Sequence, residues 1–546
     1  MSSTGASAAA SGPTEATPAW RVKADAILAR LDTLAAPAAW AALLLGVVLR
    51  VAQYASGRSL WLDEAMLALN ILHRSPWELV TRQLDYTQGA PVGFLLLAKL
   101  ATWVLGPSDA ALRLIPLLGG IAGLFLIWGA ARRILPGFGP LIALTLFAVS
   151  ERPIYFASEV KQYSTDGGIA LVLLLGGLWV LESRLRPRAL VTLGAVGAVA
   201  LWTSHPALFV LAGTGLGIGA AALRPRDRAR LPWVGLMLAM WAASLGAVYF
   251  VSLRGLAANA GLLDYWKGTF LPTPLLTSGP WLVQAVARFL WNPCRLPHIA
   301  LGAVLLLIGS VTVARVSWPA AIMLLLPFPA VLAASALHKY PFGDRLLLFL
   351  VPAVCLLIAA GCDGVRRLLG AYSAPLAVVA QLTVAAVMLY EPTFSALYRL
   401  KHPIKREELK PVMAYLREHR LPSDDVFVYD GAMYAFLYYA PRYGFQSADY
   451  RTGVCVRQHP EECAEALRAV TGHRRVWFVF SHEWSDHEPQ FQSHLDELGS
   501  RLEEFTAPGA SVMLYDLGTH PAAGTSHRHA HTVPGPPQPS NPTGPV

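Results

Sequence analysis

The chain has 546 residues, of which 54% are apolar and only 14% are charged. Soluble domains carry about a quarter charged residues, so this composition excludes an ordinary soluble enzyme. The net charge of +9 does not indicate a nucleic-acid partner, because the basic residues form short clusters between long apolar blocks, as in a polytopic membrane protein.

The N-terminal segment, residues 1–36, begins with small polar residues and lacks the apolar stretch of a cleaved signal peptide. We expect this segment to be disordered and cytoplasmic, with the first apolar block acting as a signal anchor. The membrane domain, residues 37–398, contains eleven apolar blocks that we interpret as membrane-spanning helices. These predicted spans are 38–55, 112–131, 136–150, 166–183, 189–203, 207–223, 231–253, 298–315, 318–337, 345–361 and 374–391.

A twelfth apolar run, residues 90–105, decides the topology because it is short and contains Lys99 near its middle. If this run lies along the outer face, most later basic clusters share the side of Arg21, which satisfies the positive-inside rule. We therefore predict a juxtamembrane helix at 90–105 and a cytoplasmic N-terminus. The protein is expected to be a multi-pass protein of a cell membrane, such as the inner or plasma membrane of a bacterium.

The composition becomes that of a soluble domain at residues 399–518, where helical and strand patterns alternate. Helices are predicted at 405–420, 460–470 and 486–500, and strands at 426–430, 476–481 and 511–517. The expected architecture is thus an all-α polytopic bundle with juxtamembrane helices, followed by an extracytoplasmic α/β domain and a disordered tail at 519–546. Whether Cys455 and Cys463 of the outer domain form a disulfide stays open.

Two adjacent carboxylates, Asp63 and Glu64, follow the first span directly, next to Trp61 and other apolar residues. Burial at the membrane interface raises the pKa of a carboxyl group and makes it a stronger base, so this segment suits proton abstraction. The alternative is an ordinary acidic loop in which Trp61 anchors the chain at the interface.

Two further outer loops are unusually polar for their place beside a bilayer. Residues 150–166 include Glu159, Lys161 and Tyr163, which indicates a water-filled cavity. Residues 338–345 include Lys339 and Arg345, and an arginine at this surface is well suited to bind a phosphate group. For Lys339, simple snorkelling to lipid phosphates is the competing interpretation.

Four motifs occur in a fixed order: LWLDEA at 60–65, the long segment from Gln88 to Arg133, SERPIYFASEVKQYS at 150–164, and KYPFGDRLLLFLVP at 339–352. In this order they resemble the GT-C superfamily of membrane glycosyltransferases, especially the protein O-mannosyltransferase and aminoarabinose transferase branch. The resemblance implies a bundle of eleven to thirteen helices whose first outer loop holds juxtamembrane helices. It also implies a polyprenyl phosphate sugar as donor.

Carried over by position, the resemblance makes Asp63 the base that deprotonates the acceptor, with Glu64 orienting it or the sugar and Glu159 as a further acid. Lys161 and Arg345, with Arg58 and Lys339, would bind the donor phosphate. Gln88, Tyr163 and Tyr340 are expected to contact substrate. The chain departs from the family at Gln88, where related transferases have an acidic and a basic residue, and it lacks an Asp-x-Asp in the second loop. We therefore expect no cofactor and no divalent metal.

Other functions remain open at this point. A transporter or lipid flippase predicts ionisable residues near the bilayer midplane and a repeat between two halves, and neither is evident. The outer domain could instead bind or sense a ligand, although Ser481, His482 and Glu483 alternate faces on a strand and do not form a catalytic triad. The expected activity is inverting transfer to a lipid, glycan or protein acceptor, with the sugar and the acceptor unspecified.

Overall fold

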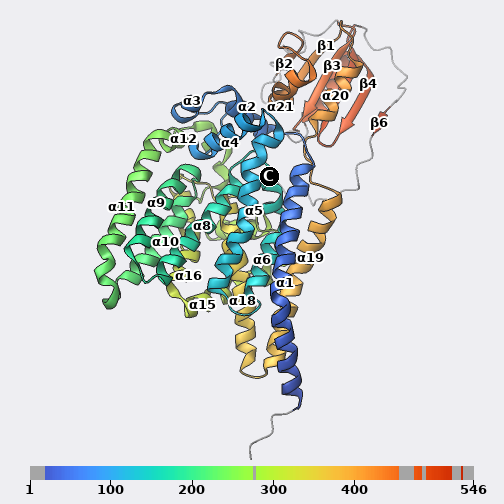
Figure 1. Cartoon of the computed structure of the whole chain (residues 1–546). Coiled ribbons are helices and arrows are strands. Elements are labelled where there is room, and N and C mark those ends of the chain that lie inside the picture. The colour runs from blue at the N-terminus through green and yellow to red at the C-terminus, as the bar shows by residue number, and fades with distance from the viewer. Residues whose placement is uncertain (1–18, 275–277, 454–472, 483–486, 519–529, 533–546) are drawn as a thin grey trace, which may run out of the picture.

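The computed structural model describes residues 19–274, 278–453, 473–482, 487–518 and 530–532 (Figure 1). The predicted helix at 460–470 and the pair of Cys455 and Cys463 lie outside the described residues. Helix α1 begins at Ala19 and so includes the second half of the N-terminal segment 1–36, whereas residues 1–18 lie outside the described part of the chain. The second half is rich in Ala, Leu and Arg, which favour helix.

Each of the eleven predicted spans coincides with a helix or a pair of consecutive helical segments. Eight helical stretches are long and apolar enough to cross a membrane, which makes the chain a multi-pass membrane protein. Helices α6, α9 and α10 are shorter, so the count of eleven spans stays a prediction. The bundle consists of α1 (Ala19–Ala55), α5 (Asp109–Ile134), α6 (Gly139–Val149), α8 (Tyr163–Glu182), α9 (Pro187–Thr203), α10 (Ala207–Ala222), η1 (Pro225–Arg230), α11 (Leu231–Val248), η2 (Tyr249–Leu253), α12 (Arg254–Ala257), α15 (Ile299–Val316), α16 (Trp318–Leu325), α17 (Pro327–Ala336), η5 (Asp344–Leu350), α18 (Val351–Gly370) and α19 (Ala374–Lys401).

Short helices cover one end of this bundle. They are α2 (Leu62–His73), α3 (Pro76–Thr81), α4 (Val92–Leu105), α7 (Glu151–Phe156), α13 (Ala260–Tyr265), η3 (Lys267–Thr269) and α14 (Gly279–Trp291). Helix α4 coincides with the predicted juxtamembrane helix and lies at the same end as α2 and α3 (Figure 1). Helix α3 starts with a capping box between Ser75 and Glu78, which fixes the turn after α2.

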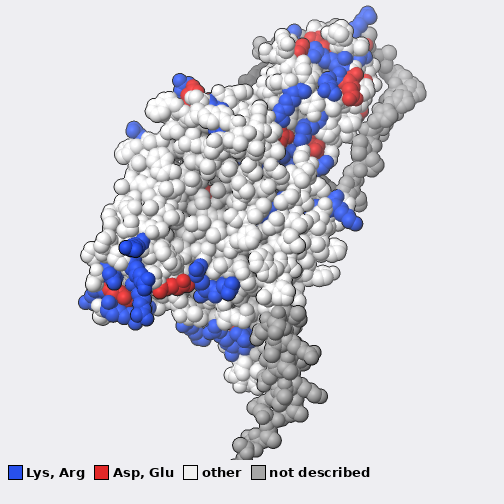
Figure 2. All heavy atoms as spheres, in the orientation of Figure 1, with Lys and Arg blue, Asp and Glu red and all other residues white. Residues whose placement is uncertain are grey.

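The two ends of the bundle differ in charge. Basic side chains gather at the end opposite α2–α4, and a broad uncharged surface separates this basic end from the charged α/β domain (Figure 2). An uncharged belt between polar ends is typical of a protein embedded in a bilayer.

The C-terminal domain contains a six-stranded sheet with the order β2-β1-β3-β5-β4-β6. Strands β1, β2 and β3 are parallel, β5 runs antiparallel to β3 and β4, and β6 is parallel to β4. The elements are α20 (Leu409–His419), β1 (Asp425–Tyr429), α21 (Asp430–Tyr439), η6 (Ala440–Tyr443), β2 (Arg451–Gly453), β3 (Val476–Ser481), α23 (His487–Leu498), β4 (Ser500–Ala507), β5 (Ala510–Asp516) and β6 (Ala530–Thr532). Strand β6 lies within the tail that was predicted to be disordered.

One hydrophobic core joins the juxtamembrane helices to the α/β domain. Leu69 of α2 and Phe94 of α4 belong to the same buried cluster as Val412 of α20 and Phe436 of α21. The opposite face of the sheet is covered separately, with Phe491 of α23 packed on Phe478. The α/β domain is therefore fixed firmly to the end of the bundle that carries Asp63.

Candidate active site

Three loops that are distant in sequence converge at this end of the bundle. The turn after α1 leads through Arg58 into α2 and places Asp63 in the first helical turn. The connection between α7 and α8 contributes Glu159 and Lys161, and the start of η5 contributes Arg345. These segments meet under the α/β domain.

Asp63 is held between two cations and an amide. Nη2 of Arg345 lies 2.5 Å from Oδ2 of Asp63, and Nε2 of Gln88 donates to Oδ1 at 3.3 Å. The Oε1 atom of Gln88 accepts a 2.5 Å hydrogen bond from Nζ of Lys161. Gln88 therefore connects the carboxylate to the buried ammonium group.

The electrostatics of Asp63 differ from the sequence prediction. Burial raises the pKa of this carboxyl group, as expected, but the charges of Lys161 and Arg345 outweigh it and hold the pKa below its ordinary value. The prediction of a raised pKa was wrong because it considered only the apolar neighbours. In this state Asp63 is ionised and ion-paired.

Glu64 has a different environment from its neighbour. Both of its oxygens bind Arg113, at 2.9 and 2.8 Å, and one also binds Arg58 at 2.5 Å. The backbone N–H of Val160 donates a further hydrogen bond to Oε1 of Glu64 at 2.8 Å. The side chain is fully buried, so its hydrogen-bonding capacity is used within the protein. This saturation argues against the expected contact of Glu64 with the sugar and assigns it to positioning the loop of Glu159 and Lys161.

Glu159 is buried without a hydrogen-bond partner for either carboxyl oxygen among the described residues. Burial, and then the charge of Glu64, raise the pKa of Glu159 above its ordinary value, against the opposing effect of Arg58. A buried polar group without a partner is costly, and such groups occur where a ligand or water completes the site. Glu159 is therefore available to a substrate hydroxyl.

We expect Glu159→Gln to stabilise the protein at neutral and alkaline pH. Because the folded-state pKa is raised, the folded chain binds more protons than the unfolded chain as pH rises from the ordinary value of about 4.3 to the raised one, and stability falls across that window. Removing the charge should restore about 1–3 kcal/mol. Thermal unfolding across a pH series would show a higher Tm and a flatter profile than the wild type or the control Glu182→Gln, and coinciding curves would contradict this account.

Two arginines that were predicted to bind the donor phosphate, Arg345 and Arg58, differ in their surroundings. Arg345 lies against an aromatic cage, with its Cζ 5.3 Å from the ring centroid of Trp61, 5.5 Å from Trp266 and 6.0 Å from Tyr163. Arg58 is buried and committed to Glu64 and to the carbonyl oxygen of Ser158, so it is not available to a phosphate.

The third outer loop contributes less than expected. Tyr340 donates its hydroxyl hydrogen to the carbonyl oxygen of Leu346 and packs edge-on against Phe209, which places it beneath the site. Lys339 is exposed and makes no side-chain hydrogen bond or ion pair with the described residues. The assignment of Lys339 to the donor phosphate therefore stays a prediction, with snorkelling to lipid phosphates as the alternative.

Several residues around Asp63 were missed in the sequence. Arg113 lies in a span that was considered only for its hydropathy, although an arginine inside an apolar block is itself a signal. Glu407, which precedes α20, accepts a hydrogen bond from the N–H of Leu62 at 3.0 Å and binds Nδ1 of His482 at 2.7 Å. His482 is close enough to contribute to the lowered pKa of Asp63. The packing of the α/β domain brings Glu407 and His482 to the site, whereas Arg113 comes from α5 of the bundle.

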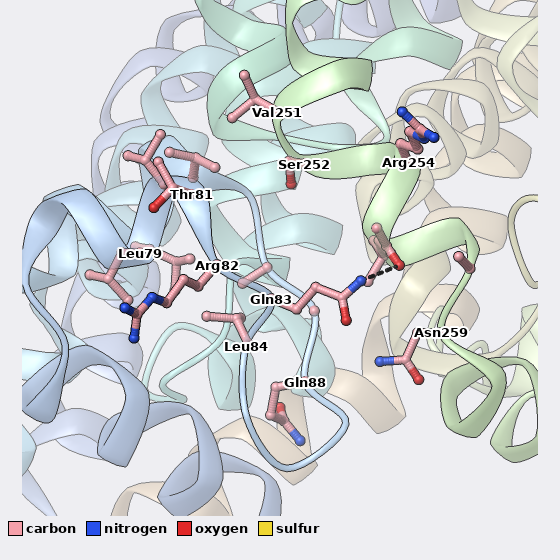
Figure 3. A pocket seen from close by; sticks show the side chains of 18 of the residues that line it. Leu79, Thr81, Arg82, Gln83, Leu84, Gln88, Val251, Ser252, Arg254 and Asn259 are labelled. Carbon is pink, nitrogen blue, oxygen red and sulfur yellow. Dashed lines mark hydrogen bonds between the residues drawn. The ribbon is translucent and has the colours of Figure 1, made fainter.

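A cavity of about 350 Å³ is lined by Gln88, the residue that hydrogen-bonds to Asp63, while Asp63 itself is not part of the lining. It lies between α3 and the start of α4 on one side and η2 and α12 on the other, and Gln88 forms part of its wall (Figure 3). The two walls are joined by a hydrogen bond from Gln83 to the carbonyl oxygen of Gly255. The lining mixes apolar side chains with Arg82, Arg254 and Asn259, and it contains no carboxylate among the described residues.

Comparison with solved structures relates this arrangement to known enzymes. ArnT from Cupriavidus metallidurans in the apo state is 14% identical with a TM-score of 0.49, covering 88% of this chain and 98% of that chain. The same protein bound to undecaprenyl phosphate gives 13% and 0.48, covering 91% and 98%. The oligosaccharyltransferase of Archaeoglobus fulgidus in complex with zinc and sulfate is 14% identical with a TM-score of 0.50, covering 88% and 73%. Both proteins are GT-C glycosyltransferases.

The chain has a GT-C fold. The resemblance predicted from the four motifs is thus confirmed at the level of the fold. No family model matches the sequence, and no curated protein sequence matches it significantly.

The described residues offer no cluster of metal ligands. Among the described residues, no three His, Cys, Asp or Glu side chains are grouped so that they could hold a metal ion. At the position of the departure from the family, Gln88 contacts Asp63 and Lys161. The expectation of metal-independent chemistry remains a prediction.

Proposed function

We propose that the protein is an integral-membrane glycosyltransferase that moves a sugar from a polyprenyl phosphate carrier to an extracytoplasmic lipid, glycan or protein acceptor. The observation that carries this proposal is the Asp63 carboxylate between the buried cations Arg345 and Lys161, at the membrane-surface end of a GT-C fold. A carboxylate next to cations offers both a base for a hydroxyl group and a binding site for a leaving phosphate.

The reaction assigns one task to each group. The acceptor hydroxyl oxygen attacks the anomeric carbon while its proton passes to Asp63. The bond from that carbon to the phosphate oxygen breaks, and the electron pair leaves with the phosphate, next to Arg345 and Lys161. Attack opposite the leaving group inverts the anomeric centre. Glu159 is placed to hydrogen-bond the sugar.

The resting ion pair implies that the donor binds before the base becomes effective. Nη2 of Arg345 is engaged by Asp63, whereas its buried Nε has no partner among the described residues, so an arriving phosphate would bind this guanidinium and compete with Asp63 for its charge. When the phosphate takes Arg345, Asp63 loses a counter-ion and its pKa rises toward that of a useful base. We assign the acceptor to the cavity that is lined by Gln88, because Gln88 also hydrogen-bonds to Asp63.

We also propose that this end of the bundle faces the extracytoplasmic side. The basic side chains at the opposite end support this orientation, because cytoplasmic loops carry an excess of Lys and Arg (Figure 2). A polyprenyl phosphate sugar in the outer leaflet would then reach Arg345 laterally.

The proposal is tested with purified protein in lipid nanodiscs and radiolabelled donors, in the presence of a chelator. We expect sugar release from polyprenyl phosphate sugars and none from nucleotide sugars. A transporter or flippase would instead move the lipid across vesicles and leave the sugar–phosphate bond intact. Intact donor lipid of every class, with any acceptor mixture, would contradict a transferase.

A further inference from the structure

The segment between α19 and α20 is fastened to the loop that leads to Asp63. Gln53 and Ile404 exchange two hydrogen bonds of 3.0 Å. Glu408 accepts from the N–H of Ser59 at 3.1 Å, and the N–H of Lys410 donates to the Ser59 hydroxyl at 3.0 Å. With Glu407 bound to Leu62, these contacts hold residues 404, 407, 408 and 410, on both sides of Arg406, against the loop that leads to Asp63.

This fastening places the Arg406 guanidinium beside the catalytic pocket. Its Cζ lies 5.2 Å from the ring centroid of Trp61 and 5.0 Å from that of Tyr155. Trp61 is also the ring against which Arg345 lies, at 5.3 Å. The charges of Arg406 and Arg345 both act on the carboxyl group of Glu159, whose oxygens are buried without a partner.

Arg406 differs from the other cations of the pocket in its hydrogen bonding. Arg58 is saturated by Glu64, Arg345 is paired with Asp63, and Lys161 donates to Gln88. Within the described part of the chain, the side chain of Arg406 makes no hydrogen bond or ion pair. A guanidinium that packs on aromatic rings through its flat face keeps its N–H edges free for bidentate binding of phosphate.

We propose that Arg406 is a phosphate-binding residue of the donor site, supplied by the junction with the α/β domain. This inference rests on the proposed function, because it assigns the ligand as the phosphate of the polyprenyl donor. Arg406 and Arg345 both lie against the ring of Trp61. Because the proposed function places the donor phosphate at Arg345, we assign the donor phosphate, and not an anionic acceptor, to Arg406 as well. The donor site is then complete only when the α/β domain is docked.

The test measures binding of polyprenyl phosphate without a sugar, and of the uncharged polyprenol, by native mass spectrometry in detergent. Arg406→Ala should weaken polyprenyl phosphate binding about 10- to 100-fold, the range for a hydrogen bond to a charged group, and leave polyprenol binding unchanged. Arg406→Lys should recover part of the affinity. Arg417→Ala is the matched control, because Arg417 is exposed and its Cζ lies 5.7 Å from the ring of Tyr443 on the domain surface.

Three outcomes separate this inference from the proposed function. Unchanged phosphate binding in Arg406→Ala, with a loss in Arg345→Ala, overturns the role of Arg406 alone. An equal loss for phosphate and polyprenol in Arg406→Ala, with a lowered Tm, assigns Arg406 to structure and also overturns it. Failure of the wild-type protein to bind polyprenyl phosphate overturns the proposed function itself.

Discussion

Asp63→Asn is expected to lower kcat/KM for sugar transfer by about 10²- to 10⁴-fold, the usual contribution of a general base. An amide of the same shape keeps the hydrogen bond with Gln88 but cannot take the proton of the acceptor hydroxyl. Release of labelled sugar from the donor measures the effect. The control is Asp85→Asn, because Asp85 lies in the same region between α1 and α5, and its exposed side chain pairs with Arg74. Full turnover in Asp63→Asn would remove Asp63 from the reaction.

The residues around Asp63 also predict in which direction the acid limb of the pH profile for sugar transfer is displaced. Burial raises the pKa of Asp63, but Lys161 and Arg345 lower it below the ordinary aspartate value in the free protein. The acid limb of kcat/KM, which reports the free enzyme, should therefore lie below the ordinary aspartate pKa of about 3.9. The acid limb of kcat, which reports the donor complex, should lie higher, because the phosphate has taken Arg345 from Asp63.

Glu64→Gln is expected to destabilise the protein by about 3–5 kcal/mol, the cost of removing one partner of a buried ion pair. The substitution leaves Arg58 and Arg113, which are 1% and 2% exposed, without a counter-ion. Thermal unfolding and the yield of monodisperse protein would measure the loss.

The matched control for Glu64→Gln is Glu182→Gln. The bridge between Glu182 and Arg133 is half exposed, and such pairs contribute at most about 1 kcal/mol. A Glu64→Gln protein with a wild-type Tm would mean that the buried arginines find other partners. Adjacent carboxylates should thus give opposite results, since Asp63→Asn should fold and fail in catalysis, whereas Glu64→Gln should fail to fold well.

The sequence predicted the helices better than the chemistry. Hydropathy alone located the long apolar helices of the bundle but not the short η1 and α12, and the charge asymmetry of the loops led to a juxtamembrane helix where α4 is found. Long apolar segments can be recognised from their own sequence, because the bilayer that each of them must cross imposes the same requirement of length and hydrophobicity. In the α/β domain, β1, β3 and β5 matched their predicted positions because each is a short run of buried apolar residues.

The missed elements lacked such a pattern. Strand β4 has the sequence SRLEEFTA, and its charged residues conceal its strand character. Helix α21 was missed because DGAMYAFLYY is rich in aromatic residues that favour strands.

The electrostatics of the site could not be obtained from local sequence. The apolar neighbours of Asp63 in the chain predict a raised pKa for its carboxyl group. Arg345, which lowers that pKa, lies 282 positions further along the chain. Likewise, nothing local distinguishes Glu64 from Asp63, because the difference arises from Arg113 in α5. The roles of two consecutive acids are determined by which arginines the fold brings to each.

The six-residue connection between α1 and α2, residues 56–61, is held by both parts of the molecule. Arg113 of the bundle binds the carbonyl oxygens of Arg58 and Ser59, while Glu408 and the Tyr439 hydroxyl accept hydrogen bonds from Ser59 and Leu60 on the domain side. Tyr439 in turn donates to Asp109, the first residue of α5, which closes a ring of contacts through both parts of the molecule. A tilt of the outer domain would therefore strain the hydrogen bonds of the segment that leads into Asp63, so the position of this carboxylate depends on how the outer domain is docked.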